Sequence, residues 1–196
     1  MRALRLLVVI STVALTIAVA VNCRSQEALQ QAAAPGPAPV GSIRDVMHNI
    51  VEYNAFKIFN AVAVTITAEG TDEKQPRTEE EWDEVFHAAI TLAESPNLLV
   101  TPGRRVSAPE EENSSDGADE LTPKQIQAKI DANRDLWLKH VAELQNVGKE
   151  TMQIVTSKNT QGLFEIGEKI DRVCENCHLE FWYPGEAAPK PANTTK

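Results

Sequence analysis

The sequence lacks several of the patterns from which function is commonly predicted. It contains no nucleophile motif, no phosphate-binding glycine loop, no assembled acid/base pair and no internal repeat. No catalytic site is therefore visible, and we expect that this protein is not an enzyme. A convincing strand-like alternation of apolar and polar residues is also missing, which leaves helical spacing as the main structural signal.

Basic residues are scarce relative to acidic ones. The chain has 19 Lys and Arg against 28 Asp and Glu among its 196 residues, which gives a formal net charge of −9 at pH 7. Nucleic acid is therefore not an expected partner, because phosphate binding requires a basic surface. The acidic balance favours encounters with proteins whose surfaces are basic.

The N-terminus has the pattern of an export signal. Arg2 and Arg5 precede an apolar run from Leu6 to Val21 that is short for a membrane span. We expect residues 1–23 to be a signal peptide, and three outcomes agree with this pattern: ordinary cleavage, a lipoprotein signal that ends at a lipidated Cys23, and an uncleaved anchor. The expected location is the periplasm, either free or attached to the membrane by lipid.

Three other segments have the composition of linkers. Residues 24–41 are a flexible Ala/Pro linker, residues 101–121 an acidic loop, and residues 184–196 a tail that we expect to be disordered. One domain, residues 42–183, remains between the linker and the tail.

Four segments of this domain have the apolar spacing of helices. The first begins at Ser42 and extends to Val62, and the second begins at Thr78 and ends before Pro96. The third begins at Thr122-Pro123, and the fourth follows a turn at 159–162. These helices predict an all-α fold, an antiparallel four-helix bundle that runs up-down-up-down. The long connection between the second and third helices also allows a crossover.

The fourth helix carries the most specific pattern, Cys174-Glu175-Asn176-Cys177-His178. Cysteines three positions apart place both sulfurs on one side of a helical turn, where they can add to the two vinyl groups of a haem. The adjacent histidine supplies an imidazole nitrogen to the iron. The pattern predicts one covalent haem c, bound through Cys174 and Cys177 with His178 as the proximal ligand.

Three other roles for the two cysteines stay open at this point. A redox-active dithiol is typical of an alternation of strands and helices that this sequence does not show. A zinc site would need two more ligands from the four histidines, none of which forms the usual paired spacing. A disulfide between residues three apart would close a very short loop and add little stability.

The arrangement resembles the class II cytochromes c, the family of cytochrome c′ and its low-spin relatives. The resemblance covers residues 42–183 and rests on the sequences Ser42 to Met47 and Ala93 to Leu99, and on the haem motif followed by Phe181. It implies an exported four-helix bundle with haem on the C-terminal helix, and a homodimer formed through the first two helices.

The resemblance also implies roles for residues of the first helix. Met47 occupies the position that faces the open side of the iron, as the distal ligand in low-spin members or as a core residue. Arg44, one turn earlier, corresponds to a basic residue that approaches a haem propionate, with a solvated arginine as the rival interpretation. His48 lies about 100° around the helix from Met47, which makes it a weaker candidate for the iron.

The remaining histidines and aromatic residues have no assigned ligand role. His87 and His140 occur singly on their helices, where a histidine in the core or on the surface is the simpler interpretation. Trp82 and Trp137 are expected in the core or at a haem edge. Arg104 and Arg105 are candidates for propionate contacts, or for an exposed pair in the loop.

These observations predict a periplasmic electron-transfer protein. A Met axial ligand raises the reduction potential of a haem and keeps the coordination constant between the two oxidation states. The alternative is a gas-binding protein with an open iron site, in which Met47 only fills space. A peroxidase is a weaker third possibility, because the sequence offers only His48 as a distal acid/base group.

Overall fold

The computed structural model describes residues 38–114 and 120–185. The chain divides into two units, Met1–Ala38 and Pro39–Lys196. The predicted signal peptide with Cys23, and the linker up to residue 37, lie outside the described residues. So does the predicted tail from residue 186 onward. The structural description therefore concerns the second unit.

The first helical segment is built of three helices that follow one another directly. They are α2 (Ile43–Val46), the π-helix η1 (Met47–Glu52) and α3 (Tyr53–Phe59). Ser42 caps α2 in a capping box, since its hydroxyl accepts from the Asp45 N–H and its own N–H donates to the Asp45 carboxylate. The predicted start at Ser42 is confirmed.

A β-hairpin follows, where the sequence analysis expected the first helix to reach Val62. Strand β1 (Ala63–Thr67) pairs antiparallel with β2 (Gly70–Lys74), with Thr67 opposite Gly70. The expectation of an all-α fold is wrong for this element. Its β-branched run, Val64 to Thr67, favours strand, but almost all of its side chains are exposed, so no buried face produces the alternation that marks a strand.

Helix α4 (Glu79–Leu99) begins at the predicted cap, Thr78, and continues through Pro96, where we expected it to end. Proline lacks an N–H, so the carbonyl of Leu92 loses its helical donor. The hydroxyl of Ser95 donates to that carbonyl at 3.0 Å instead. With this local replacement the helix continues through Pro96 to Leu99.

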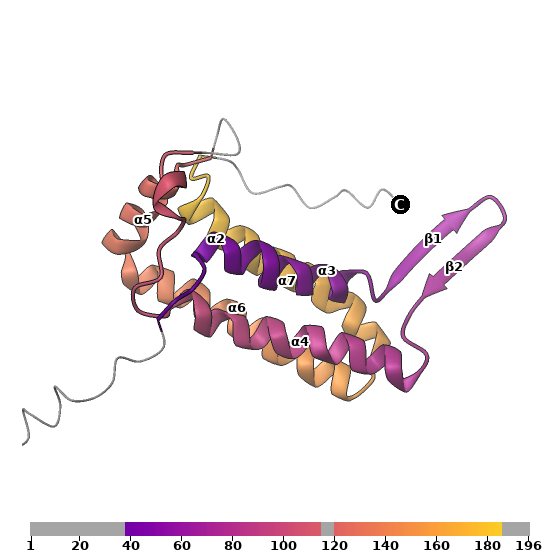
Figure 1. Ribbon diagram of the computed structural model, residues 1–196. Coiled ribbons are helices and arrows are strands. Elements are labelled where there is room, and N and C mark those ends of the chain that lie inside the picture. Colours follow the sequence, from indigo (N-terminus) through magenta and orange to yellow (C-terminus); the bar gives the residue numbers. More distant parts are fainter. Residues whose placement is uncertain (1–37, 115–119, 186–196) are drawn as a thin grey trace, which may run out of the picture. The chain divides into compact units, whose positions relative to one another are not determined.

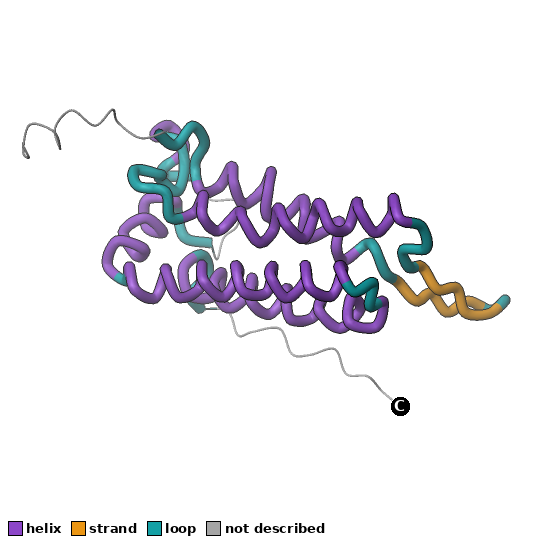
Figure 2. Tube along the Cα trace, turned by 90° about the horizontal axis from the view of Figure 1, so that it is seen from below, coloured by secondary structure: helices purple, strands orange, loops and turns teal. Residues whose placement is uncertain are grey.

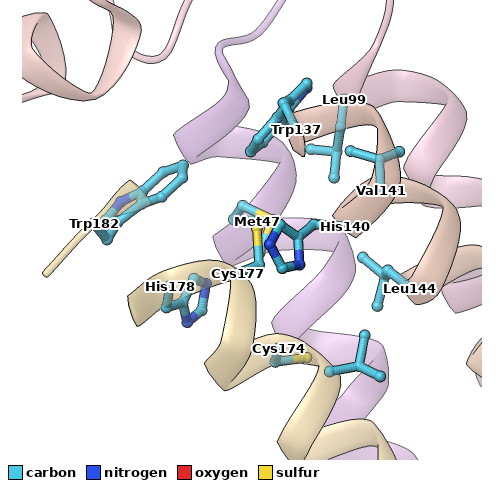
Figure 3. A pocket seen from close by; sticks show the side chains of 11 residues that line it. Met47, Leu99, Trp137, His140, Val141, Leu144, Cys174, Cys177, His178 and Trp182 are labelled. Atoms are coloured by element: carbon cyan, nitrogen blue, oxygen red, sulfur yellow. The ribbon is translucent and has the colours of Figure 1, made fainter. Parts of the chain in front are cut away.

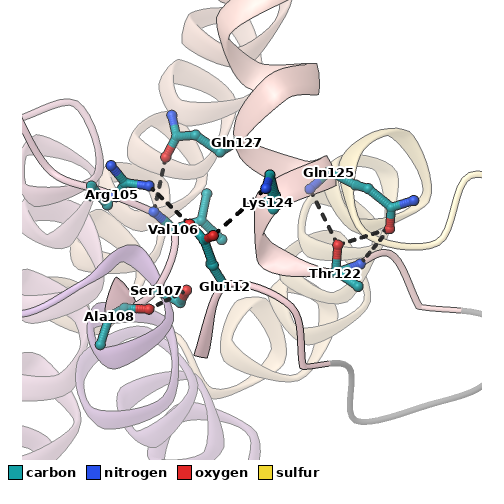
Figure 4. A network of polar contacts seen from close by, with 9 residues as sticks. All are labelled: Arg105, Val106, Ser107, Ala108, Glu112, Thr122, Lys124, Gln125 and Gln127. Atoms are coloured by element: carbon teal, nitrogen blue, oxygen red, sulfur yellow. Dashed lines mark hydrogen bonds and ion pairs between the residues drawn. The ribbon is translucent and has the colours of Figure 1, made fainter. Parts of the chain in front are cut away.

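The loop after α4 packs against the domain and contains the short 3₁₀ helix η2 (Pro109–Glu111). The carbonyls of Arg105 and Val106 accept from the first N–H groups of α2, and Val106 itself is buried. The Val106 N–H donates to Gln127 Oε1 at 3.1 Å (Figure 4). Residues 101–114 thus form a loop that packs against the domain, while residues 115–119 lie outside the described part.

The predicted third helix is two helices, α5 (Pro123–Ala132) and α6 (Arg134–Thr156), which are separated at Asn133. The last helix, α7 (Thr160–Phe181), begins at Asn159, whose side chain accepts from the Gly162 N–H. Both predicted starts, at Thr122 and at the turn near Asn159, are confirmed.

The long helices pack on one another around one hydrophobic core. Helix α4 contacts α6, α6 contacts α7, and α3 contacts both α4 and α7 (Figures 1 and 2). The core includes Trp137, Ile170 and Phe181, whose side chains are almost completely buried. The fold is thus mainly α. In the described ranges no helix combines the length and the apolar character needed to cross a membrane.

Candidate functional site

The Cys174-to-His178 motif lies in a pocket between the first helical segment and helices α4, α6 and α7 (Figure 3). Its lining consists of apolar, aromatic and sulfur-containing side chains together with two histidines: Met47, Leu99, Trp137, His140, Val141, Leu144, Val173, Cys174, Cys177, His178 and Trp182. The pocket thus contains all three residues of the predicted attachment site and the predicted distal residue.

The apolar stripe of α7 explains why the cysteines face this pocket. Leu163, Ile166 and Ile170 are buried at intervals of three and four residues, and Phe181 is buried at the end of the same helix. Cys174 and Cys177 continue this spacing, so their side chains turn toward the core and pack against it. The sequence could therefore predict the side of the helix on which both sulfurs lie.

The environment of the two thiols favours the protonated form. Burial raises the pKa of Cys174 to about 11, and the nearby Asp171 carboxylate adds to this shift. Burial raises the pKa of Cys177 to about 12, with a further contribution from Cys174. Both cysteines are free thiols. A redox-active dithiol needs a lowered thiol pKa, so this environment argues against that alternative, and the free thiols argue against the disulfide.

The ring of His178 is held between two aromatic side chains that follow α7. The centroids of the Trp182 and Tyr183 rings lie 5.8 and 5.9 Å from that of His178. The Tyr183 hydroxyl donates to Glu175 Oε2 at 3.0 Å. Burial lowers the pKa of His178, although the nearby Glu175 carboxylate acts in the opposite direction. The lowered pKa favours the neutral imidazole, which is the form that binds a metal.

Met47 is the first residue of the π-helix. Its side chain lines the pocket, although it lies more than 120 residues before Cys174 in the sequence. A π-turn is frequent at functional sites because it changes the direction of the side chains around it. His48 does not line the pocket: its side chain is 60% exposed and its Nδ1 lies 3.0 Å from Glu52 Oε2. The structure therefore brings Met47, and not His48, together with the motif.

The three candidate arginines lie outside this pocket. Arg44 lines a neighbouring small cavity together with Val106 and Glu120, and Trp182 borders both cavities. Arg104 donates to the Leu98 carbonyl at 2.6 Å and to the carbonyl of Gly41.

Arg105 forms an ion pair with Glu112 at 3.6 Å (Figure 4). The described contacts of Arg104 and Arg105 thus stabilise the loop and the start of the first helix.

His140 is a pocket residue for which no role was predicted. It lines the pocket from α6 with a side chain that is 11% exposed, one turn after Trp137. A signal was present, because His140 lies on the same stripe as Val141 and Leu144. His87, the other histidine left without a role, is exposed on α4.

Metal binding by side chains alone finds no support in the described ranges. No group of three or more His, Cys, Asp or Glu side chains there is placed to hold a metal ion. A tetrahedral structural zinc site would need four such ligands. Among the described residues, four such ligands do not come together.

The residues of the pocket fit a haem in their chemistry. Two thiols on one face of a helix, a neutral imidazole beside them and a thioether across the pocket are the groups that attach and ligate a haem c. The apolar lining suits a porphyrin. The free volume, about 20 Å³, holds one water at most, so a macrocycle requires the surrounding side chains to move apart.

Comparison of the chain with family models, with curated proteins and with solved structures finds no match. The resemblance to class II cytochromes c thus rests on the sequence motifs quoted above.

Proposed function

We propose that this protein is an exported monohaem c-type cytochrome that transfers electrons. The observation that carries the proposal is the meeting of Met47 with Cys174, Cys177 and His178 in one apolar pocket. Residues of the first and last helical segments thereby form a set that would attach a haem and supply ligands to its iron. A haem in such a site supplies reversible one-electron chemistry at the iron.

In this proposal each residue has a defined role. Cys174 and Cys177 form thioether bonds, His178 is the proximal ligand and Met47 the distal ligand. Trp182 and Tyr183 restrict the orientation of the His178 ring. The aliphatic lining excludes water, and this exclusion and the thioether ligand both raise the reduction potential. The protein is then a carrier and not an enzyme.

The arrangement of the domain belongs to the same proposal. We infer an antiparallel four-helix bundle that runs up-down-up-down, with haem near the end of α7. The short turn between α6 and α7, which contact one another, supports antiparallel neighbours. The N-terminal pattern supports a periplasmic location, either free or attached to the membrane through a lipidated Cys23.

The test is the optical spectrum of the purified holoprotein, oxidised and reduced, with and without carbon monoxide. A low-spin spectrum that carbon monoxide does not change, with a methionine-to-iron charge-transfer band, is the expected result. The band should vanish in Met47→Ala and persist in Met152→Ala. Met152 is the matched control because it is a partly buried methionine of α6 that lies outside the pocket.

Two other results would contradict the proposal. A high-spin spectrum that shifts with carbon monoxide and ignores Met47→Ala would indicate gas binding, in which the apolar wall surrounds an open iron site. A chain that shows no haem absorbance after expression with a haem-attachment system would exclude both functions.

A further inference from the structure

Two buried nitrogen atoms in the pocket have no hydrogen-bond partner. Among the buried side-chain nitrogen and oxygen atoms that the structure describes, these are Nε1 of Trp137 and Nδ1 of His140. Both residues lie on α6, one turn apart, and both line the pocket that contains the haem motif (Figure 3). Their coincidence on one wall indicates a polar group that binds there.

The indole of Trp137 is fixed in place by its neighbours. Its side chain is 1% exposed, its ring meets the Phe181 ring edge-on at 5.5 Å, and it stacks on Trp182 at 6.3 Å. An indole nitrogen can only donate, so the partner that it needs is an acceptor. A buried N–H donor without an acceptor destabilises the folded protein. Such a donor is explained where a bound ligand supplies the acceptor.

His140 contributes the second of the two unpartnered nitrogen atoms, its Nδ1. Its ring meets Phe181 edge-on at 6.1 Å, and its Nδ1 lies 3.2 Å from Glu143 Oε2, at an angle that does not make a hydrogen bond. In the tautomer with a proton on Nδ1 this nitrogen donates as well. Trp137 and His140 can thus each offer a donor to a group in the pocket.

Apart from the imidazole of His178, which the proposed function assigns to the iron, the other lining side chains are thiols, a thioether, hydrocarbons and a second indole, none of which is a strong acceptor. The Glu143 carboxylate, 3.2 Å from His140 Nδ1, does not line the pocket. A haem carries two propionate carboxylates, which are its strong acceptors. We propose that Trp137 and His140 bind one of these carboxylates by donating hydrogen bonds to it. The inference rests on the proposed function and assigns to α6 a role that the resemblance gave to Arg44.

The test uses the propionate bending band in the resonance Raman spectrum of the holoprotein, because this band responds to hydrogen bonds at the carboxylate. Trp137→Phe removes the N–H and keeps an aromatic ring, and we expect it to shift the band. Trp82→Phe is the control, since Trp82 is buried on α4 outside the pocket. His140→Leu should shift the band and His140→Gln, which keeps a donor, should shift it less.

Several results would overturn the inference. One is a band that is unchanged in Trp137→Phe. Another is a new spin state in His140→Leu, which would make His140 an iron ligand.

A crystal structure of the wild-type holoprotein decides the matter if the variants do not fold. The expected distance from Trp137 Nε1 to a propionate oxygen is about 2.7–3.2 Å. Two propionates that both face solvent or Arg44 would contradict the inference and leave the proposed function intact. A protein without haem absorbance would remove the proposed function and this inference together.

Discussion

At the scale of the residue, the site depends on how burial changes ordinary side chains. Cys174, Cys177 and His178 are adjacent in sequence, but the α7 stripe sets their burial, and burial raises the thiol pKa values and lowers that of the imidazole. The setting thus extends the pH range over which the thiols stay protonated, and it keeps the imidazole available as a ligand.

The capping box that starts α2 leads to a prediction about acid stability. The backbone N–H of Ser42, and then its hydroxyl, lower the pKa of Asp45 below its usual 3.8. A carboxyl whose folded-state pKa is lowered contributes stability that is complete above the unfolded value and is lost as the pH falls through the folded value. The contribution of Asp45 should therefore be present at neutral pH and disappear in strong acid.

The measurement is urea unfolding of the wild type and Asp45→Asn near neutral pH and at about pH 2.5. We expect the variant to be less stable near neutral pH, with a difference that shrinks in acid. Asp83→Asn, which removes an exposed carboxylate of α4, controls for the loss of one negative charge. A difference for Asp45→Asn that is equal at both pH values would contradict the prediction.

At the scale of the element, the sequence predicted the helix starts better than the interiors. Ser42, Thr78, Thr122 and Asn159 all cap helices, because a cap depends on a side chain and an N–H two or three residues away. The passage of α4 through Pro96 also has a local explanation in Ser95, but this hydrogen bond could not be foreseen from residue type alone.

The features that the sequence did not predict depend on distant contacts. The buried Val106 is held by α2 and by Gln127, from two different parts of the chain. The π-turn at Met47 has no signature in composition, although the Asn54 amide, which donates to the Ile50 carbonyl at 2.7 Å, supports it.

The close contact of α4 with α6 leads to a prediction that opposes helix propensity. A Cβ atom at Gly148 would lie 2.6 Å from Ala93 Cα and 2.8 Å from Ala93 N, which are backbone atoms that cannot turn aside. Alanine is favoured over glycine in a helix by about 1 kcal/mol, but the overlap forces the two helices apart. We expect Gly148→Ala to lower the free energy of unfolding by about 1–3 kcal/mol.

Gly167→Ala provides the matched control on α7. A Cβ there would meet Phe59 Cδ1 at 3.5 Å, an ordinary contact, so helix propensity should dominate. We expect this variant to gain about 0.5–1 kcal/mol in the free energy of unfolding. The measurement for both variants is chemical denaturation of the holoprotein. A Gly148→Ala variant as stable as Gly167→Ala would show that α4 and α6 pack less closely than the structure describes.

At the scale of the whole molecule, the chain has a negative net charge, and several of its carboxylates lie near the pocket. The carboxylates of Glu143 and Glu180 act on Cys177, and those of Glu52, Glu120 and Glu175 act on His178. Lysine ion pairs at Glu143 and Glu180 offset part of this charge. A redox partner that approaches this region would meet a mainly acidic rim, in keeping with the net charge of −9 of the whole chain.

This acidic rim predicts opposite salt dependences for two small oxidants of the reduced holoprotein. Oxidation by a cationic cobalt phenanthroline complex should slow as ionic strength rises, because salt screens its attraction to the rim. Oxidation by anionic ferricyanide should accelerate, because salt screens the repulsion. Stopped-flow rates over a range of ionic strengths, where the screening length falls from about 30 to 3 Å, measure both slopes.

Paired variants separate the local rim from the net charge of the molecule. Glu143→Gln with Glu180→Gln removes two charges beside the motif, whereas Glu165→Gln with Glu168→Gln removes two exposed charges from the first half of α7. Both pairs change the net charge equally, so a larger loss of slope in the first pair would place electron exchange at the pocket. Equal losses would indicate that only the overall charge matters, and slopes of the same sign for both oxidants would contradict an acidic approach surface.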